Sequence, residues 1–189
     1  MKRAQQVMLV GSTLVLSWLG MQATHELGHL SGAWLTGGSV SRLVLHPLTI
    51  SRTELSSNPH PLVVVWAGPV VGLLLPIIFW AAAVAAHLRG SFLFRFFAGF
   101  CLIANGAYIA VGSIDGVGDC GEMLRNGSGA WQLWLFGLLT VPPGFLLWHG
   151  EGVHFGFGPS DGKVDAAVTY CTLMAATTLA TLELVLGSH

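Results

Sequence analysis

Charged side chains are scarce in this sequence. Lys, Arg, Asp and Glu together make up 9% of the 189 residues, whereas a soluble domain contains roughly a quarter of such residues. Eight basic and nine acidic residues give a formal net charge of −1, so no basic surface is available to attract nucleic acid. We therefore expect no nucleic-acid partner, and we expect that water is not the solvent around most of the chain.

Cysteine is also rare. The three cysteines, Cys101, Cys120 and Cys171, lie far apart, within or beside apolar runs. Their spacing is not the paired spacing that marks a zinc ribbon or a disulfide framework. We interpret them as free thiols that pack among apolar side chains.

Long apolar runs are abundant, and 53% of the residues are hydrophobic. A helix needs about 20 mainly apolar residues to cross the hydrocarbon core of a bilayer. Five segments meet this requirement, and in the fourth we expect Pro142-Pro143 to break the helix. The expected fold class is all-α, a polytopic helical membrane protein with about five (four to six) transmembrane helices. The segments are residues 7–35, 62–87, 92–111, 131–148 and 164–186.

Two stretches between these helices are less apolar. Residues 37–61 mix β-branched and apolar residues with Ser, Thr and Arg, which predicts a small β-hairpin or a membrane-surface loop. Residues 113–125 are rich in glycine and acids, and form either the end of the third helix or a short helix that dips back into the membrane. No linker or internal repeat divides the chain, so we expect one integral, multi-pass domain over residues 1–189, located in the cell membrane.

The segment from Thr24 to His29 contains the pattern H-E-x-x-H. In a helix, His25 and His29 lie one turn apart on the same face, so both can direct a ring nitrogen at a single ion. Glu26 then lies beside the ion and can act as general base on a water whose pKa zinc lowers towards neutrality. The pattern predicts a hydrolytic zinc site.

Such patterns also occur by chance on soluble helices, where polar residues cost little. Here the helix is otherwise apolar, and an ionisable side chain at membrane depth costs roughly a few kcal/mol. An ionisable residue inside a membrane helix therefore indicates a functional site, which favours the metal-binding interpretation over chance.

A catalytic zinc site usually has three protein ligands and one open position. Asp115, Asp119 and Glu122 lie in the Gly-rich stretch directly after a spanning helix. If this stretch is helical, Asp115 and Asp119 are one turn apart and face the same way. The alternative is that these acids cap a helix or lie in a solvated loop.

With these motifs the chain resembles the site-2-protease family of intramembrane zinc metalloproteases. The resemblance covers roughly residues 7–125, the expected zinc-site core, and leaves the C-terminal helices at 131–186 outside it. The motifs that carry it are His25-Glu26-Leu27-Gly28-His29, Gly37-Gly38-Ser39-Val40, Ala67-Gly68-Pro69 with Gly72, and Ile114-Asp115-Gly116.

This resemblance implies that His25, His29 and Asp115 bind zinc and that Glu26 activates the water that attacks a peptide bond. Family members commonly have Asn and Pro ahead of the Asp-Gly motif, whereas this chain has Gly112-Ser113-Ile114 there. Asp119 is therefore the alternative third ligand, or a partner that orients a histidine. Asn105, the nearest asparagine, is a candidate for an oxyanion or substrate contact.

Taken together, the sequence predicts an intramembrane zinc metallopeptidase with Glu26 as general base. Its expected partners are the lipid bilayer and a membrane-protein or peptide substrate. Two alternatives from another class stay open: a non-proteolytic metal-binding protein or transporter of the membrane, and a catalytically degenerate family member that binds clients without cutting them.

Overall fold

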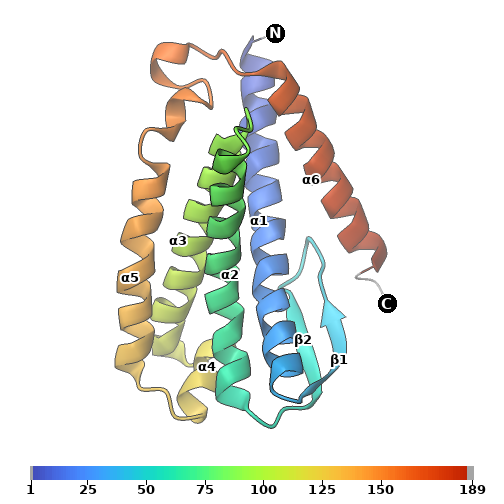
Figure 1. The fold of residues 1–189 in the computed structure, drawn as a ribbon, viewed down its shortest axis with the longest axis vertical. Helices are drawn as coiled ribbons and strands as arrows, with labels where there is room; N and C mark the ends of the chain where they lie inside the picture. Colours follow the sequence, from blue (N-terminus) through green and yellow to red (C-terminus); the bar gives the residue numbers. More distant parts are fainter. Residues whose placement is uncertain (1, 187–189) are drawn as a thin grey trace.

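The structure is a computed structural model that describes residues 2–186, and it is built mainly of long helices (Figure 1). The described part of the chain has six α-helices and a two-stranded antiparallel hairpin, which lies beside α1 at the edge of the bundle (Figure 1), and two 3-10 turns connect the last two helices. In chain order the elements are α1 (Lys2–Leu35), β1 (Ser39–Val44), β2 (Arg52–Ser57), α2 (Pro61–Ala85), α3 (Ser91–Asp115), α4 (Gly118–Arg125), α5 (Ala130–Trp148), η1 (Glu151–Val153), η2 (Gly158–Ser160) and α6 (Ala166–Leu186).

Five of these helices, α1, α2, α3, α5 and α6, are long and apolar enough to cross a membrane. Together with the hairpin between the first two, they confirm the expected fold class of a polytopic helical protein. The expected break at Pro142-Pro143 was wrong, because α5 continues through both prolines. Proline removes one helical hydrogen bond, but membrane helices tolerate it because local adjustments and neighbouring helices satisfy the freed carbonyl groups.

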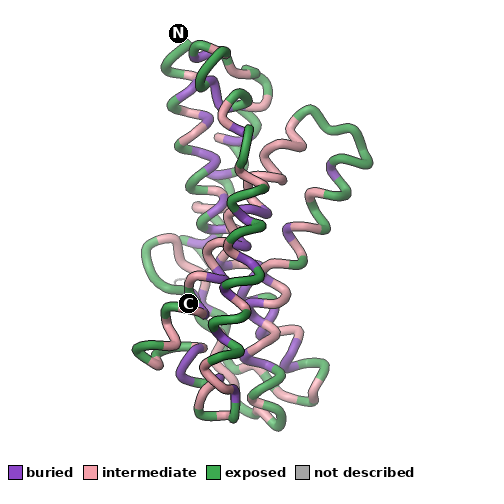
Figure 2. Tube along the Cα trace, turned by 90° about the vertical axis from the view of Figure 1, so that its left-hand side faces the viewer, coloured by how far each residue is buried: buried purple, intermediate pink, exposed green. Residues whose placement is uncertain are grey.

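The polarity of α1 is the reverse of that of a helix on a water-soluble protein. Its buried face carries polar side chains such as Ser17, Gln22 and Glu26, while Leu14 and Trp18 are 46% exposed. Figure 2 shows buried and exposed residues alternating along the long helices. Apolar side chains that face outwards are stable in lipid, and ionisable groups in membrane helices face the bundle interior.

The helices form a layered bundle in which α1 packs against α2, α2 against α3, and α3 against α5, while α6 contacts α1 (Figure 1). A small buried core lies where α2, α3, α4 and α5 meet. This core fixes the short helix α4 against the membrane helices, and it consists of Val65, Ile109, Cys120, Met123 and Leu133.

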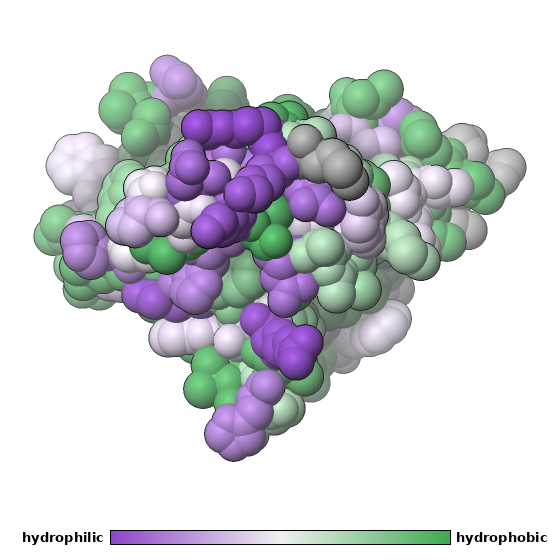
Figure 3. All heavy atoms as spheres, turned by 90° about the horizontal axis from the view of Figure 1, so that it is seen from above, coloured by the Kyte–Doolittle hydropathy of each residue, from purple (hydrophilic) through white to green (hydrophobic). Residues whose placement is uncertain are grey.

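Polar side chains gather at the end of the bundle where the chain begins, with apolar ones among and around them (Figure 3). At this end the Gln6 amide donates a hydrogen bond to the Phe155 carbonyl at 3.0 Å. Arg95, at the start of α3, donates to the Glu151 carboxylate at 2.6 Å. These contacts attach the connection between α5 and α6 to α1 and α3.

Glycine allows α1 and α2 to pack closely beside the histidines. A Cβ atom added at Gly28 would overlap the Ala67 carbonyl group and lie 2.7 Å from the Gly68 Cα, whereas Gly11 on the same helix has no such neighbour within 4 Å. We therefore expect Gly28→Ala to destabilise the protein by about 1–3 kcal/mol through overpacking. Thermal unfolding in detergent measures the effect, and Gly11→Ala is the matched control, which we expect to leave the unfolding temperature unchanged or raised. Equal unfolding temperatures for the two variants would contradict this packing argument.

Candidate metal centre

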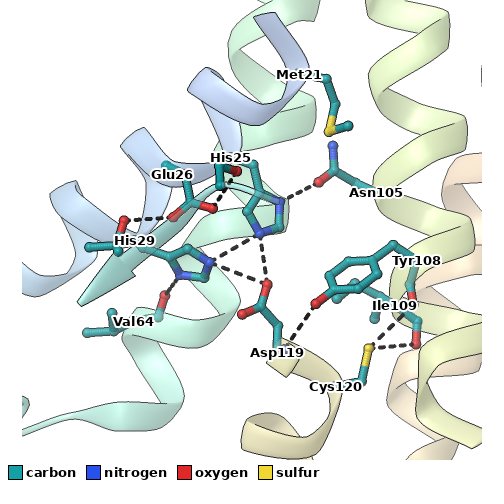
Figure 4. Close-up of polar contacts among 12 residues, drawn as sticks. Met21, His25, Glu26, His29, Val64, Asn105, Tyr108, Ile109, Asp119 and Cys120 are labelled. Atoms are coloured by element: carbon teal, nitrogen blue, oxygen red, sulfur yellow. Dashed lines mark hydrogen bonds and ion pairs between the residues drawn. The ribbon is translucent and has the colours of Figure 1, made fainter. Parts of the chain in front are cut away.

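His25 and His29 lie one turn apart on α1, and their Nε2 atoms are 3.1 Å from each other. The carboxylate of Asp119, in the first turn of α4, faces both rings. Its Oδ2 atom lies 2.8 Å from Nε2 of His25 and 3.4 Å from Nε2 of His29 (Figure 4). Two nitrogens and one oxygen from two separate helices therefore converge on one point.

The opposite nitrogen of each ring is held by a fixed partner. Nδ1 of His25 lies 2.7 Å from the Asn105 amide oxygen, and the amide nitrogen of Asn105 donates to the Cys101 carbonyl at 2.9 Å. Nδ1 of His29 lies 2.9 Å from the carbonyl oxygen of Val64. Because both partners are acceptors, both Nδ1 atoms carry the proton, and both Nε2 atoms are directed at the convergence point.

These three atoms are suited to a metal ion. Two Nε2 atoms and an ionised carboxylate stay this close only when a positive charge lies between them, whether a shared proton or a metal cation. Imidazole nitrogen and carboxylate oxygen are ligands of zinc, and two histidines with one acid are a known catalytic zinc set. Burial supports the same conclusion, because the two histidines are each 8% exposed.

The conformation of two glycines brings Asp119, and not Asp115, to this point. Asp115 is the last residue of α3 and is exposed, and its carboxylate makes no hydrogen bond or ion pair with any of residues 2–186. Gly116 and Gly118 then adopt positive φ values of 62° and 56°, which glycine reaches without the cost that other residues pay. The chain turns there, so the two aspartates do not lie on one continuous helix.

Tyr108 fixes the start of α4 from the side of α3. The backbone N–H of Asp119 donates a hydrogen bond to the Tyr108 hydroxyl at 3.1 Å. A Cβ atom at Gly118 would overlap this hydroxyl, so glycine is needed there for the close approach as well as for its backbone angle. Burial alone would raise the pKa of the Asp119 carboxyl, but its hydrogen bonds with His25 and His29 hold the pKa well below the usual range.

Glu26 lies on the other side of the two histidines and contacts the hairpin. The Ser51 hydroxyl donates to one carboxylate oxygen at 2.9 Å, and the Thr53 hydroxyl donates to the other at 2.7 Å. One ligand atom from each of His25, Glu26 and His29 lies within 4.8 Å of the others. Glu26 is thus near the convergence point, but in contact with the hairpin.

A cavity of about 860 Å³ adjoins these side chains. Residues of α1, the hairpin, α2, α3 and α4 line it, including the apolar side chains of Trp18, Met21 and Ile50. Its volume lies within the range of sites that bind small molecules or short peptide segments. Asn105 also lines the cavity, but both ends of its amide are used by His25 and Cys101.

The structure brings His25, Glu26, His29, Asn105 and Asp119 together and leaves Asp115 outside. Sequence reasoning missed the carbonyl of Val64, which no side-chain pattern can reveal. It also missed Ser51 and Thr53, because whether their hydroxyls reach Glu26 depends on how the segment 37–61 packs against α1, which its composition does not determine. The Ala-Gly-Pro motif packs closely on the site, because a Cβ atom at Gly68 would overlap the His29 ring.

Comparison with known proteins identifies the family of the chain. A family model described as Peptidase M50B-like matches residues 6–110, which is more than half of the chain. The matched range includes the two histidines and Glu26, and ends before Asp115 and Asp119. No curated protein matches the chain, and no solved structure matches it. The chain belongs to the Peptidase M50B-like family, the family of the site-2 proteases, and is a multi-pass membrane protein.

Proposed function

We propose that this protein is an intramembrane zinc metallopeptidase in which His25, His29 and Asp119 hold the ion and Glu26 is the general base. The observation that carries the proposal is the convergence of three ligand atoms with both histidine tautomers fixed. Membership of a peptidase family supports the same chemistry.

Asp119 replaces Asp115 in this proposal. The Asp-Gly motif favours Asp115, but the exposed position of Asp115 at the end of α3 keeps its carboxylate away from both histidines. Asp119 contacts both rings, and the apolar core around α4 holds it there. A carboxylate in that position completes a set of two histidines and one acid, and leaves a coordination position open for substrate or water.

Each residue has a separate part in the proposed reaction. A zinc ion, when bound, would lower the pKa of water and polarise the scissile carbonyl group. Glu26 accepts the proton of the attacking water at its carboxylate and delivers it to the leaving amine. Asn105 keeps Nε2 of His25 directed at the ion. We therefore propose Asn105 as a positioning residue and not as an oxyanion or substrate contact.

The cavity indicates the class of substrate. Its apolar side chains come from membrane helices and from the hairpin, so its lining suits an apolar peptide segment. We propose that the substrate is a membrane protein or membrane peptide whose cleaved segment enters this cavity, and that the enzyme works in the cell membrane.

Cleavage by the purified full chain in liposomes tests this function. The substrates are a fluorophore-labelled single-span membrane peptide and casein as an unfolded soluble protein. We expect that a zinc chelator abolishes cleavage of the membrane peptide and that added zinc restores it. Cleavage that persists after complete removal of metal would overturn the proposal. Zinc flux across the vesicle wall, unchanged in Glu26→Gln, would identify a transporter instead.

A further inference from the structure

We propose that Ser51 and Thr53 are positioning residues that hold the carboxylate of Glu26 back from the metal. This inference rests on the proposed function, because it assigns a role towards the general base of that reaction. In this proposal the hairpin between α1 and α2 contributes to catalysis, in addition to lining the cavity.

Both oxygens of the Glu26 carboxylate are hydrogen-bonded to the hairpin. Each of its oxygens accepts one hydroxyl hydrogen bond, from Ser51 at 2.9 Å and from Thr53 at 2.7 Å. Glu26 is 4% exposed, so water cannot readily replace these two donors. Charge-assisted bonds of this kind are about twice as strong as neutral ones, and together they fix the direction of the carboxylate.

The hairpin is attached so that both hydroxyls reach the same carboxylate. The backbone N–H of Ser51 donates to the Gln22 side chain on α1 at 3.0 Å. Thr53 is paired with Leu43 across the hairpin. Ser51 directly precedes β2 and Thr53 is its second residue, and Arg52 between them bonds to Glu54 instead. A slip of one residue in this register would turn the Thr53 hydroxyl away from Glu26.

The distance between Glu26 and the histidines explains why such a restraint is needed. A ligand atom of Glu26 lies within 4.8 Å of the histidine nitrogens, and carboxylate oxygen is itself a ligand of zinc. A glutamate side chain without fixed partners can rotate and bind the ion directly. It would then fill the position that substrate or water needs, and no base would remain. The two hydroxyls therefore keep Glu26 available as a base.

The test replaces both hydroxyls in the full chain, as Ser51→Ala with Thr53→Val. We expect kcat for the labelled membrane peptide to fall about 10–100-fold with KM unchanged. Zinc affinity, measured by chelator competition, should be equal to or higher than that of the wild type, because the released carboxylate can bind the ion. A merely structural defect would instead lower zinc affinity together with cleavage.

Two further variants separate the hydroxyl from the shape of the side chain. Thr53→Val keeps the branched shape and should lower kcat about tenfold by itself, so it provides the test if the double variant does not fold. Thr53→Ser keeps the hydroxyl and should restore most of the activity. Ser56→Ala is the matched control for Ser51→Ala, since the Ser56 hydroxyl bonds to Ser39 on the exposed side of the hairpin.

The failure of this inference can be distinguished from the failure of the proposed function. Wild-type kcat in the Ser51→Ala, Thr53→Val protein, with Glu26→Gln inactive, would overturn the role of the hydroxyls and leave the peptidase in place. Loss of zinc in the double variant would also overturn it. If Glu26→Gln cleaves like the wild type, the proposed function itself is wrong.

Discussion

Replacement of Glu26 by glutamine is expected to reduce cleavage of a membrane peptide by about 10²–10⁴-fold, the usual contribution of a general base. Glutamine has nearly the shape of glutamate, and its amide oxygen can still accept a hydrogen bond from a hairpin hydroxyl. It cannot accept the proton of the attacking water. Because Glu26 is not among the proposed zinc ligands, we expect zinc affinity to stay within a few-fold of the wild type.

Glu54→Gln is the control for this substitution. Glu54 lies on β2 and its carboxylate pairs with Arg52 at the surface of the hairpin, so its replacement should leave kcat unchanged. Cleavage rate and bound zinc are measured on the same samples. Undiminished cleavage by Glu26→Gln would remove Glu26 from the mechanism, and loss of zinc in that variant would place it among the ligands.

Replacement of Asp119 by asparagine is the second change with a large expected effect. Loss of a side chain that only orients a ligand lowers metal affinity by about 10–100-fold. We expect Asp119→Asn to lower zinc affinity by more than this. Asp119 approaches both Nε2 atoms directly, so its negative charge and one ligand oxygen are lost together. Cleavage should be lost with the zinc.

Asp115→Asn is the matched control for Asp119→Asn, because it removes the charge of the aspartate that lies four residues earlier in the chain. Its side chain is exposed at the end of α3 and bonds to none of residues 2–186, so zinc affinity and cleavage should equal those of the wild type. Chelator competition measures both variants. The reverse result, with zinc lost only from Asp115→Asn, would return the third ligand to the Asp-Gly motif. If both variants bind zinc as tightly as the wild type, neither aspartate is an essential ligand.

The membrane architecture was predictable from the sequence because it depends on length and hydropathy. A run of about 20 apolar residues has few alternatives to a helix in lipid, and each expected span agrees with a helix to within a few residues. The composition of residues 37–61 predicted a β-hairpin or a membrane-surface loop, and the structure has the hairpin. The continuity of α5 through Pro142 was not predictable, since it depends on how the neighbouring helices accommodate the freed carbonyl groups.

The two histidines and Glu26 were equally predictable, because their spacing along one helix determines their geometry. Which aspartate faces the two histidines was not predictable in this way. A continuous helix would place Asp115 and Asp119 on one face, but Gly116 and Gly118 take left-handed conformations that end α3 and begin α4. Glycine allows this turn without requiring it, so the choice between the aspartates depends on tertiary packing around Tyr108 and the core below α4.

The orientation of the two histidine rings depends on contacts with helices other than α1. Val64 belongs to α2 and Asn105 to α3, while both rings belong to α1. In a newly inserted chain, α1 can cross the bilayer alone, but its rings then have no partners to direct them. The proposed ion would be held only after three helices and α4 have packed together. In the proposed enzyme, a half-assembled copy would therefore have no activity, and cleavage of neighbouring membrane proteins would begin only after folding is complete.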